Sequence, residues 1–178
     1  MSKHKLIKFL NKKNISLGLS NNTTDLRPVE NVGYGRFATQ NINEDEIIYR
    51  AGGMWITDEE RNCYEQDYFH LVEGCCFFQG GLKYYLNGCH NHSCEPNAYV
   101  QENIIRALKD IKKDEQITID YASFIDHGYT ILAECNCGSN TCRNHITGND
   151  WQLYNLPLKY NYRVSGSILR KWLLSQKT

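Results

Sequence analysis

The chain has 178 residues, 41% of them hydrophobic, which suits one domain with modest extensions and a buried core. Twenty basic and twenty acidic side chains cancel, which excludes a whole-molecule field that would draw the protein to nucleic acid or an acidic membrane. No apolar run approaches the ~18 residues of a membrane span, and the N-terminus lacks the apolar core of a secretory signal. We therefore expect a soluble, intracellular protein, cytoplasmic by default.

Residues 1–28 are expected to form a lysine-rich N-terminal extension. Residues 1–13 place five lysines around four apolar side chains. Such a segment can be a small amphipathic helix for a partner or a membrane, but it is more often a solvated terminal helix or tail. The polar stretch "SNNTTDLRP", residues 20–28, is predicted to be a linker or turn.

From about Val29 the chain shows the patterns of short strands. "GYGRFATQ" predicts a tight glycine turn running into a half-buried strand, and "NEDEIIYRAGG" predicts a second strand closed by Gly52 and Gly53. Thr57 and Glu60 have the spacing of a capping box, which predicts the start of a helix in the middle region.

After Cys75 the apolar and aromatic pieces become short, as in small strands. "CCFFQG" and "LKYYLNG" are separated by glycines, and "NAYVQ" and "IIRALKDI" are joined by two polar residues, which predicts a hairpin. "EQITIDYA" alternates as one more strand, with Ile117 and Ile119 on one face. The last segment is predicted to be a helix whose packing stripe consists of Ile168, Leu169, Trp172 and Leu173.

The cysteines bear on the chemistry. There are eight, at positions 63, 75, 76, 89, 94, 135, 137 and 142. In a secreted chain they could form four disulfides, whereas in a reducing compartment the same count indicates a metal site or buried thiols.

Three of these cysteines form a C-x-C-x4-C pattern in a loop rich in glycine and asparagine. Cys135 and Cys137 are two residues apart, and Gly138 supplies backbone freedom for a chain that folds round a metal. The alternative is three unrelated thiols, free or in disulfides, but core packing explains them poorly in such a loop. A structural zinc ion needs a fourth ligand, and the candidates are Cys94, Cys89, His92 and His145.

Four separated segments then agree with one family. They are "GYG" at residues 33–35, "NHSCEPN" at 91–97, "EQITIDY" at 115–121 and "CNCGSNTCR" at 135–143. In this order and rough spacing, the chain resembles the SET-domain lysine methyltransferases with a post-SET zinc motif, over about residues 29–148. The tail beginning "ITGNDW" also looks like the small stand-alone bacterial SET proteins.

The resemblance implies a mainly β fold with short helices. It is a β-clip of several small sheets with a pseudoknot, in which the segment matching "NHSC" lies under the chain matching the final strand. The expected divisions are a SET domain at residues 29–125 with an insert at about 54–85, a zinc-binding post-SET segment at 126–148, and a C-terminal extension with a helix at 149–178.

The resemblance also implies the cofactor, S-adenosylmethionine, which would bind on one face of the knot and leave as S-adenosylhomocysteine. The residues expected against it are Gly33, Tyr34 and Gly35 at its methionine part, Asn91 and His92 at its amino group and adenine, and His145 and Ile146 over adenine. Without the other motifs, the glycine triplet would be an ordinary turn and His92 a satisfied buried histidine. Cys94 matches the fourth ligand of a structural zinc ion, beside Cys135, Cys137 and Cys142.

The same resemblance assigns the chemistry. Tyr121 matches the catalytic tyrosine, and Ile119, Tyr85 and Phe124 are expected to line the lysine channel. Where the family often has tyrosine or phenylalanine, Ile119 cannot hydrogen-bond a water that would crowd out further methylation. We therefore expect products beyond monomethyl-lysine.

Other departures affect the substrate side. "NGCH" precedes the "NHSC" motif where the family usually has an arginine-aromatic pair, and "CRN" replaces the commoner "CRG". The expected partner is a lysine-containing protein such as a histone, with neither a membrane nor sequence-specific nucleic-acid binding; a histone substrate would fit the nucleus of a host cell.

The alternatives are an inactive SET module that binds a lysine peptide, and methylation of a small amine or free amino acid. A zinc-ribbon nucleic-acid binder would need a basic patch around the cysteines, which is lacking.

Overall fold

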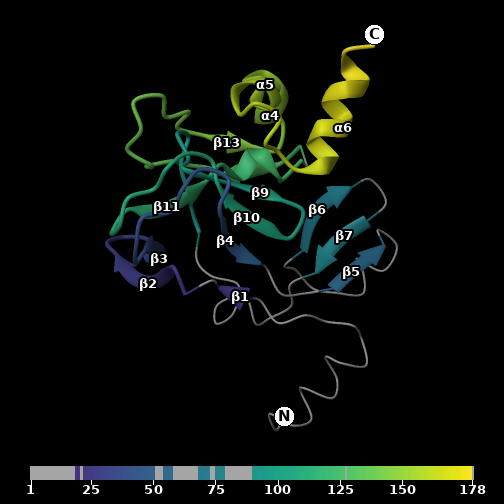
Figure 1. Ribbon diagram of the computed structural model, residues 1–178. Coiled ribbons are helices and arrows are strands. Elements are labelled where there is room, and N and C mark those ends of the chain that lie inside the picture. The colour runs from purple at the N-terminus through teal and green to yellow at the C-terminus, as the bar shows by residue number, and fades with distance from the viewer. Residues whose placement is uncertain are drawn as a thin grey trace, which may run out of the picture.

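The structure, a computed structural model, describes residues 19–20, 22–50, 54–57, 68–72, 75–78, 90–126 and 128–177, with the backbone alone in 19–20, 54–57, 68–72 and 75–78. Tyr85, Cys89, most of the extension 1–28 and the helix predicted after Thr57 lie outside the described residues. The described chain is mainly β with short helices, as the sequence predicts (Figure 1).

The first seven strands are β1 (Leu19–Ser20), β2 (Thr24–Val29), β3 (Gly33–Ala38), β4 (Ile47–Arg50), β5 (Met54–Thr57), β6 (Tyr68–Val72) and β7 (Cys75–Phe78). The others are β8 (Asn91–His92), β9 (Ala98–Gln101), β10 (Ile104–Ala107), β11 (Gln116–Ile119), β12 (Thr130–Leu132) and β13 (Ile146–Thr147). The helices are η1 (Tyr121–Ser123), α4 (Asp150–Leu153), α5 (Leu156–Lys159) and α6 (Gly166–Ser175).

The strands form three sheets. The largest has the order β1-β4-β10-β9-β11-β3-β2, with β8 paired to β11 beside this path, and β5-β7-β6 and β12-β13 form two smaller sheets. Figure 1 shows β2 and β3 at one side of the molecule, β5 to β7 at the other, and α4, α5 and α6 together above the central strands. Among the described residues, no helix has the length and apolar character that a membrane span needs.

The polar stretch predicted to be a linker is instead mostly β2, so that prediction is wrong. β2 pairs antiparallel with β3 along its whole length, from Thr24 opposite Ala38 to Val29 opposite Gly33. β2 is the last strand of the sheet. Because no further strand of the described chain pairs with its outer edge, it tolerates Pro28, which has no backbone N–H to donate. Arg27 and Asp25 form an ion pair at 2.9 Å along it, which explains why polar side chains suit this edge strand.

The hairpin predicted between β9 and β10 is present. The strands pair from Gln101 opposite Ile104 to Ala98 opposite Ala107, and Glu102 in the turn has a φ of 53°. The polar residues of the turn therefore close the hairpin, while Val100, Ile105 and the alanines of both strands are buried in the core.

A crossing of two segments lies at the centre of the fold. β8 runs parallel to β11, with Asn91 opposite Thr118 and His92 opposite Ile119, although the β9–β10 hairpin separates them in the sequence. The Ser93 N–H donates to the Ile119 carbonyl at 3.1 Å, which continues the pairing. This is the relation between the "NHSC" segment and the final strand that the resemblance implies.

Two apolar clusters support this crossing. The first is made of the main sheet and includes both Ile117 and Ile119, which are buried as their alternation predicts. The second joins Cys94 and Cys135 to residues of the C-terminal segment, among them Trp151, Leu156, Tyr160 and Ile168.

The second cluster defines the packing face of the C-terminal helix. Ser165 caps α6 by accepting a hydrogen bond from the Ile168 N–H, and Ile168 is fully buried in the cluster. Leu169 and Trp172 pack against the cluster, whereas Leu173 is 50% exposed. The buried stripe is therefore narrower than the sequence predicts.

Candidate functional site

His92 lies at the centre of the crossing and uses both ring nitrogens. Its Nδ1 accepts the backbone N–H of Tyr121 at 3.2 Å, and its Nε2 lies 3.3 Å from the Cys94 sulfur. Burial lowers the pKa of His92 to about 4, so the ring is neutral at physiological pH. Because Nδ1 accepts, the single ring proton must be on Nε2, and His92 therefore donates to Cys94.

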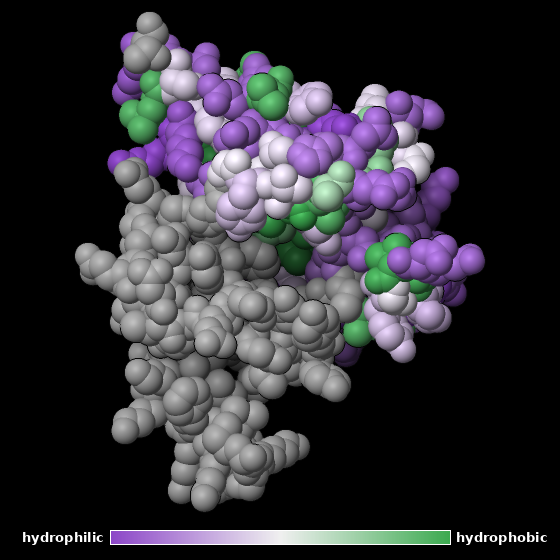
Figure 2. Space-filling view, turned by 180° about the vertical axis from the view of Figure 1, so that it is seen from behind, coloured by the Kyte–Doolittle hydropathy of each residue, from purple (hydrophilic) through white to green (hydrophobic). Residues whose placement is uncertain are grey.

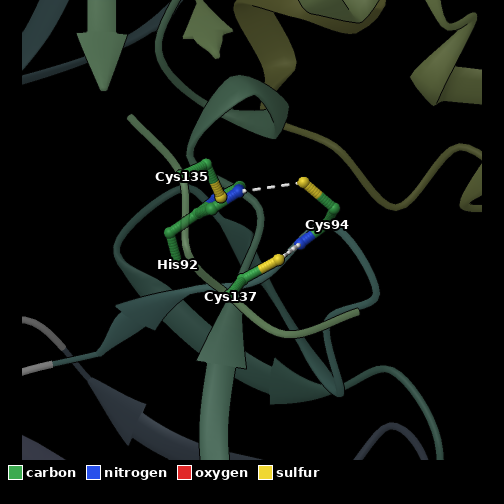
Figure 3. A group of neighbouring side chains, drawn as sticks. All are labelled: His92, Cys94, Cys135 and Cys137. Atoms are coloured by element: carbon green, nitrogen blue, oxygen red, sulfur yellow. Dashed lines mark hydrogen bonds between the residues drawn. The ribbon is translucent and has the colours of Figure 1, made fainter. Parts of the chain in front are cut away.

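Thiols gather beside this imidazole. Among the described residues, the potential ligand atoms of His92, Cys94, Cys135 and Cys137 all lie within 4.8 Å of one another. Figure 3 shows these side chains pointing toward one another from β8, the turn after it and the 135–137 loop. Cys142 is outside this group of four, but its Sγ is 3.1 Å from the Cys135 carbonyl oxygen.

Backbone N–H groups are directed at three of the sulfurs. The N–H of Cys94 donates to Cys137 Sγ at 3.5 Å, that of Arg143 to Cys94 Sγ at 3.4 Å, and that of Asn144 to Cys142 Sγ at 3.4 Å. Burial opposes ionisation of Cys137, yet hydrogen bonds from Cys94 and Ser139 outweigh it and lower the pKa of this thiol to about 6. Burial raises the pKa of Cys94 and of Cys135.

This donor set fits a zinc ion. Zinc is bound by thiolates in closed four-ligand sites, and buried thiols with N–H groups directed at sulfur match that chemistry. The Nε2 of His92 is a poorer ligand than a thiolate. Because Nδ1 accepts the Tyr121 N–H, the ring proton is on Nε2 and blocks its lone pair.

Tyr121 begins η1 directly after β11. Its hydroxyl donates to the His90 carbonyl at 3.0 Å, and its ring lies 5.2 Å from that of His92 and 6.1 Å from that of Phe124, edge to face in the latter case. Phe124 and Ile119 are both buried in the first cluster, against which Tyr121 packs. The ring of Tyr121 thus packs on buried apolar and aromatic side chains, and its hydroxyl is fixed by a backbone carbonyl.

The glycine triplet of β3 lies against β8. Asn91 Nδ2 donates to the Tyr34 carbonyl at 3.2 Å, and a Cβ on Gly35 would lie 3.0 Å from Asn91 Nδ2 and 2.3 Å from Gln116 Nε2. Gly35 is therefore a position of close backbone approach, and Gly33 has a φ of +100°, which favours glycine. The structure thus brings Asn91 into contact with the triplet, while His92, the next residue, contacts Tyr121 and Cys94.

The two residues expected over adenine differ in exposure. His145 is exposed, with Nδ1 3.2 Å from the Ala133 carbonyl oxygen, whereas Ile146 in β13 is fully buried in the second cluster. Of the two, His145 is therefore the one whose side chain is open to a ligand.

A buried ion network next to the site was not predicted from the sequence. Asp120 is 1% exposed and lies 2.6 Å from Arg143 Nη2, while Arg143 Nη1 is 3.3 Å from Asp150 and the Tyr160 hydroxyl donates to Asp120 at 2.8 Å. Burial opposes ionisation of Arg143, but Asp120 outweighs it and raises the pKa of the guanidinium above its usual value. The signal in the sequence was one charged residue within each of two motifs, Asp120 before Tyr121 and Arg143 after Cys142.

Comparison with known proteins identifies a family for the region that contains the site. The SET domain model matches residues 33–122, just over half of the 178-residue chain. A relative from Saccharomyces cerevisiae, named histone-lysine N-methyltransferase, H3 lysine-36 specific, is 28% identical over 166 residues that cover 82% of this chain and 22% of the relative. A relative of the same name from Debaryomyces hansenii is 30% identical over 133 residues, covering 65% and 18%.

The chain thus spans about a fifth of the length of these curated relatives. Among solved structures, the methyltransferase domain of human histone-lysine N-methyltransferase SETMAR matches with a TM-score of 0.51 and 18% identity, covering 68% of this chain and 56% of that one. This likeness supports the fold.

Proposed function

Because the chain belongs to the SET-domain family, we propose that it is an S-adenosylmethionine-dependent methyltransferase that acts on the side-chain amine of lysine in a protein. The observation that carries this proposal is the junction of Tyr121 with Asn91 and His92 where β8 crosses β11. The residue with the candidate catalytic hydroxyl is thereby bonded directly to a candidate cofactor residue, His92.

The cofactor supplies an electrophilic methyl group on a sulfonium. The lysine nitrogen would form a bond to the methyl carbon as the carbon–sulfur bond breaks, so that S-adenosylhomocysteine would leave, and the proton of the methylated amine would go to solvent. Such a direct displacement needs a neutral amine, an in-line approach and little water. It needs no metal at the reacting atoms.

Tyr121 suits the role of orienting the reacting groups. Its hydroxyl proton is donated to the His90 carbonyl, so toward the amine hydrogens and the partly positive methyl group its oxygen would act as an acceptor. Phe124 and Ile119 keep its surroundings apolar, which strengthens these electrostatic contacts. Tyr121 is the proposed catalytic residue, and Phe124 and Ile119 are proposed channel residues.

The proposed cofactor site is formed by β3, β8 and the loop before β13. The backbone of Gly33, Tyr34 and Gly35 would hold the methionine part, and Asn91 and His92 the amino group and adenine. The bond from Asn91 to the Tyr34 carbonyl supports this arrangement, since it fixes the two segments to each other. His145, the exposed one of the pair His145 and Ile146, would lie over adenine.

We assign a structural zinc ion to Cys94, Cys135, Cys137 and Cys142. Zinc would fold the 135–143 loop and join it to the turn after β8. The tautomer of His92 supports four thiolates, because its Nε2–H is suited to donate to the Cys94 sulfur.

Ile119 supports a product beyond monomethyl-lysine. Its side chain is apolar and 5% exposed, so it offers no hydrogen bond to a water that would occupy the space of a second methyl group. The proposed substrate is a histone or another basic protein, since the relatives are named for histone H3 lysine-36. A histone substrate would place the reaction in a nucleus.

The test is transfer of labelled methyl groups. Zinc-replete protein and its Tyr121→Phe variant are incubated with labelled S-adenosylmethionine and a panel of histones, ribosomal proteins and free amino acids. Label in a protein band that fades with the variant supports the proposal, and label only in free amino acids contradicts a protein substrate. If nothing is labelled and calorimetry finds no cofactor binding, the protein is an inactive module.

A further inference from the structure

The C-terminal segment 149–177, here called the tail, holds both ends of the helix that carries Tyr121. The Tyr160 hydroxyl donates to Oδ2 of Asp120 at 2.8 Å, and Asp120 is the N-cap residue of η1. At the other end of η1, the Ser165 N–H donates to the Ser123 carbonyl at 2.9 Å. The tail therefore contacts both ends of η1, a helix of three residues that begins with the candidate catalytic residue Tyr121.

Asp120 is the point where three segments meet. Its Oδ1 accepts the Ala122 N–H at 3.1 Å, which caps η1, and Arg143 Nη2 at 2.6 Å, which comes from the cysteine loop. Its Oδ2 accepts the Tyr160 hydroxyl. With η1, the loop and the tail each supplying a donor, the carboxylate has one orientation that satisfies all three.

Tyr160 is suited to be a permanent donor. It is 6% exposed, and burial together with the Asp120 carboxylate raises the pKa of its hydroxyl, so the proton stays on oxygen. Its neighbour Lys159 donates from Nζ to the Cys94 carbonyl at 3.0 Å. The end of α5 therefore contacts η1 and the turn after β8 at the same time.

We infer that Tyr160 is a positioning residue for the proposed methyl transfer: its bond to Asp120 fixes the start of η1 and thereby the direction of the Tyr121 hydroxyl. Tyr121 makes two bonds at once, from its N–H to His92 and from its O–H to the His90 carbonyl, and both require one backbone conformation at the start of η1. Without the Tyr160 hydroxyl, Oδ2 is buried with one donor fewer, and the carboxylate is free to turn away from Ala122. The inference rests on the proposed function.

The test compares Tyr160→Phe with Tyr162→Phe. Both variants lose only a hydroxyl from the tail, but Tyr162 is 47% exposed and its ring packs edge to face on Trp172. We expect Tyr160→Phe to shift the Tyr121 and Ala122 amide resonances in NMR spectra and to lower kcat about tenfold, with KM for the cofactor within about twofold. Tyr162→Phe should change neither quantity.

A double variant distinguishes the loss of the Tyr160–Asp120 hydrogen bond from a general loss of structure. If Tyr160 acts through Asp120, adding Tyr160→Phe to an Asp120→Asn background should change kcat by less than about twofold. Full additivity of the two changes would overturn the inference, as would a Tyr121 amide that does not move in Tyr160→Phe. A moved amide in a protein that methylates no substrate would sink the proposed function and still support the coupling of Tyr160 to Tyr121.

Discussion

The backbone N–H of Tyr121 donates to Nδ1 of His92 at 3.2 Å, and the other nitrogen of the same ring faces the Cys94 sulfur at 3.3 Å. One imidazole therefore joins the candidate catalytic tyrosine to the proposed zinc-bound turn. The ring is buried and neutral, so both contacts depend on its tautomer and not on a charge.

Replacing that imidazole tests the link. His92→Gln removes the ring acceptor for the Tyr121 N–H, and a displacement of the reacting groups by about 1 Å can cost roughly 100-fold in rate. We expect kcat to fall by about that factor, together with weaker cofactor binding by calorimetry. Wild-type kinetics in the variant would show that the ring does not orient Tyr121.

Tyr121→Phe removes one hydroxyl and keeps the ring on Phe124. The His90 carbonyl loses its donor, and the methyl group loses a contact made chiefly in the transition state, which is worth roughly 10²–10³-fold in kcat. Since the cofactor contacts expected from Asn91 and His92 remain, cofactor affinity should change little. Stopped-flow or single-turnover methylation separates the two quantities, and a loss confined to binding would argue against a catalytic hydroxyl.

The elements that could be predicted from the sequence are those whose pattern lies within a few neighbouring residues. The β9–β10 hairpin follows from two polar residues between apolar runs, and the burial of Ile117 and Ile119 follows from their alternation. β2 was missed, because no side chain of this strand is fully buried and the strand therefore has little apolar pattern. The Asp120–Arg143–Tyr160 network was also missed, since its residues are far apart in the chain and only the fold brings them together.

Gly35→Ala tests the close approach of β3 to β8. The new Cβ would lie 2.3 Å from Gln116 Nε2 and 2.9 Å from Val29 Cγ2, so either the β3 backbone or the side chains of Gln116 and Asn91 must shift. We expect cofactor affinity to fall at least about tenfold, since a small displacement of positioning groups is costly. Gly128→Ala is the matched control, because its Cβ would have ordinary contacts with Asn149 at 3.5 Å. Equal cofactor affinities in both variants would contradict a binding role for Gly35.

Acid should weaken the contact between Arg163 of the tail and Asp45 in the turn before β4, here called the anchor. Asp45 accepts the Tyr99 hydroxyl at 3.0 Å and Arg163 at 2.8 Å, and these bonds lower the pKa of its carboxyl. A lowered folded-state pKa means that the stabilisation is present above the unfolded value and is lost as pH falls through the folded value.

The matched variant is Asp45→Asn, since asparagine also tolerates the φ of 63° at this position. The difference in unfolding free energy between wild type and variant should be under about 1 kcal/mol at pH 7, because the side chain is 53% exposed, and should be smaller at pH 3. Urea unfolding at both pH values measures it. A difference that grows on acidification would contradict the anchor.

Zinc content decides between the two possible ligand sets. If four thiolates bind the ion, purified wild type should hold one zinc per chain, Cys142→Ser should lose it, and His92→Gln should keep it. The reason is that the His92 Nε2 proton is directed at Cys94, whereas Asn144 directs its N–H at the Cys142 sulfur. Metal analysis of the two variants, with chelator-induced unfolding of the wild type, gives the answer. The reverse pattern would assign the ion to His92, Cys94, Cys135 and Cys137, the group of four that lies within 4.8 Å.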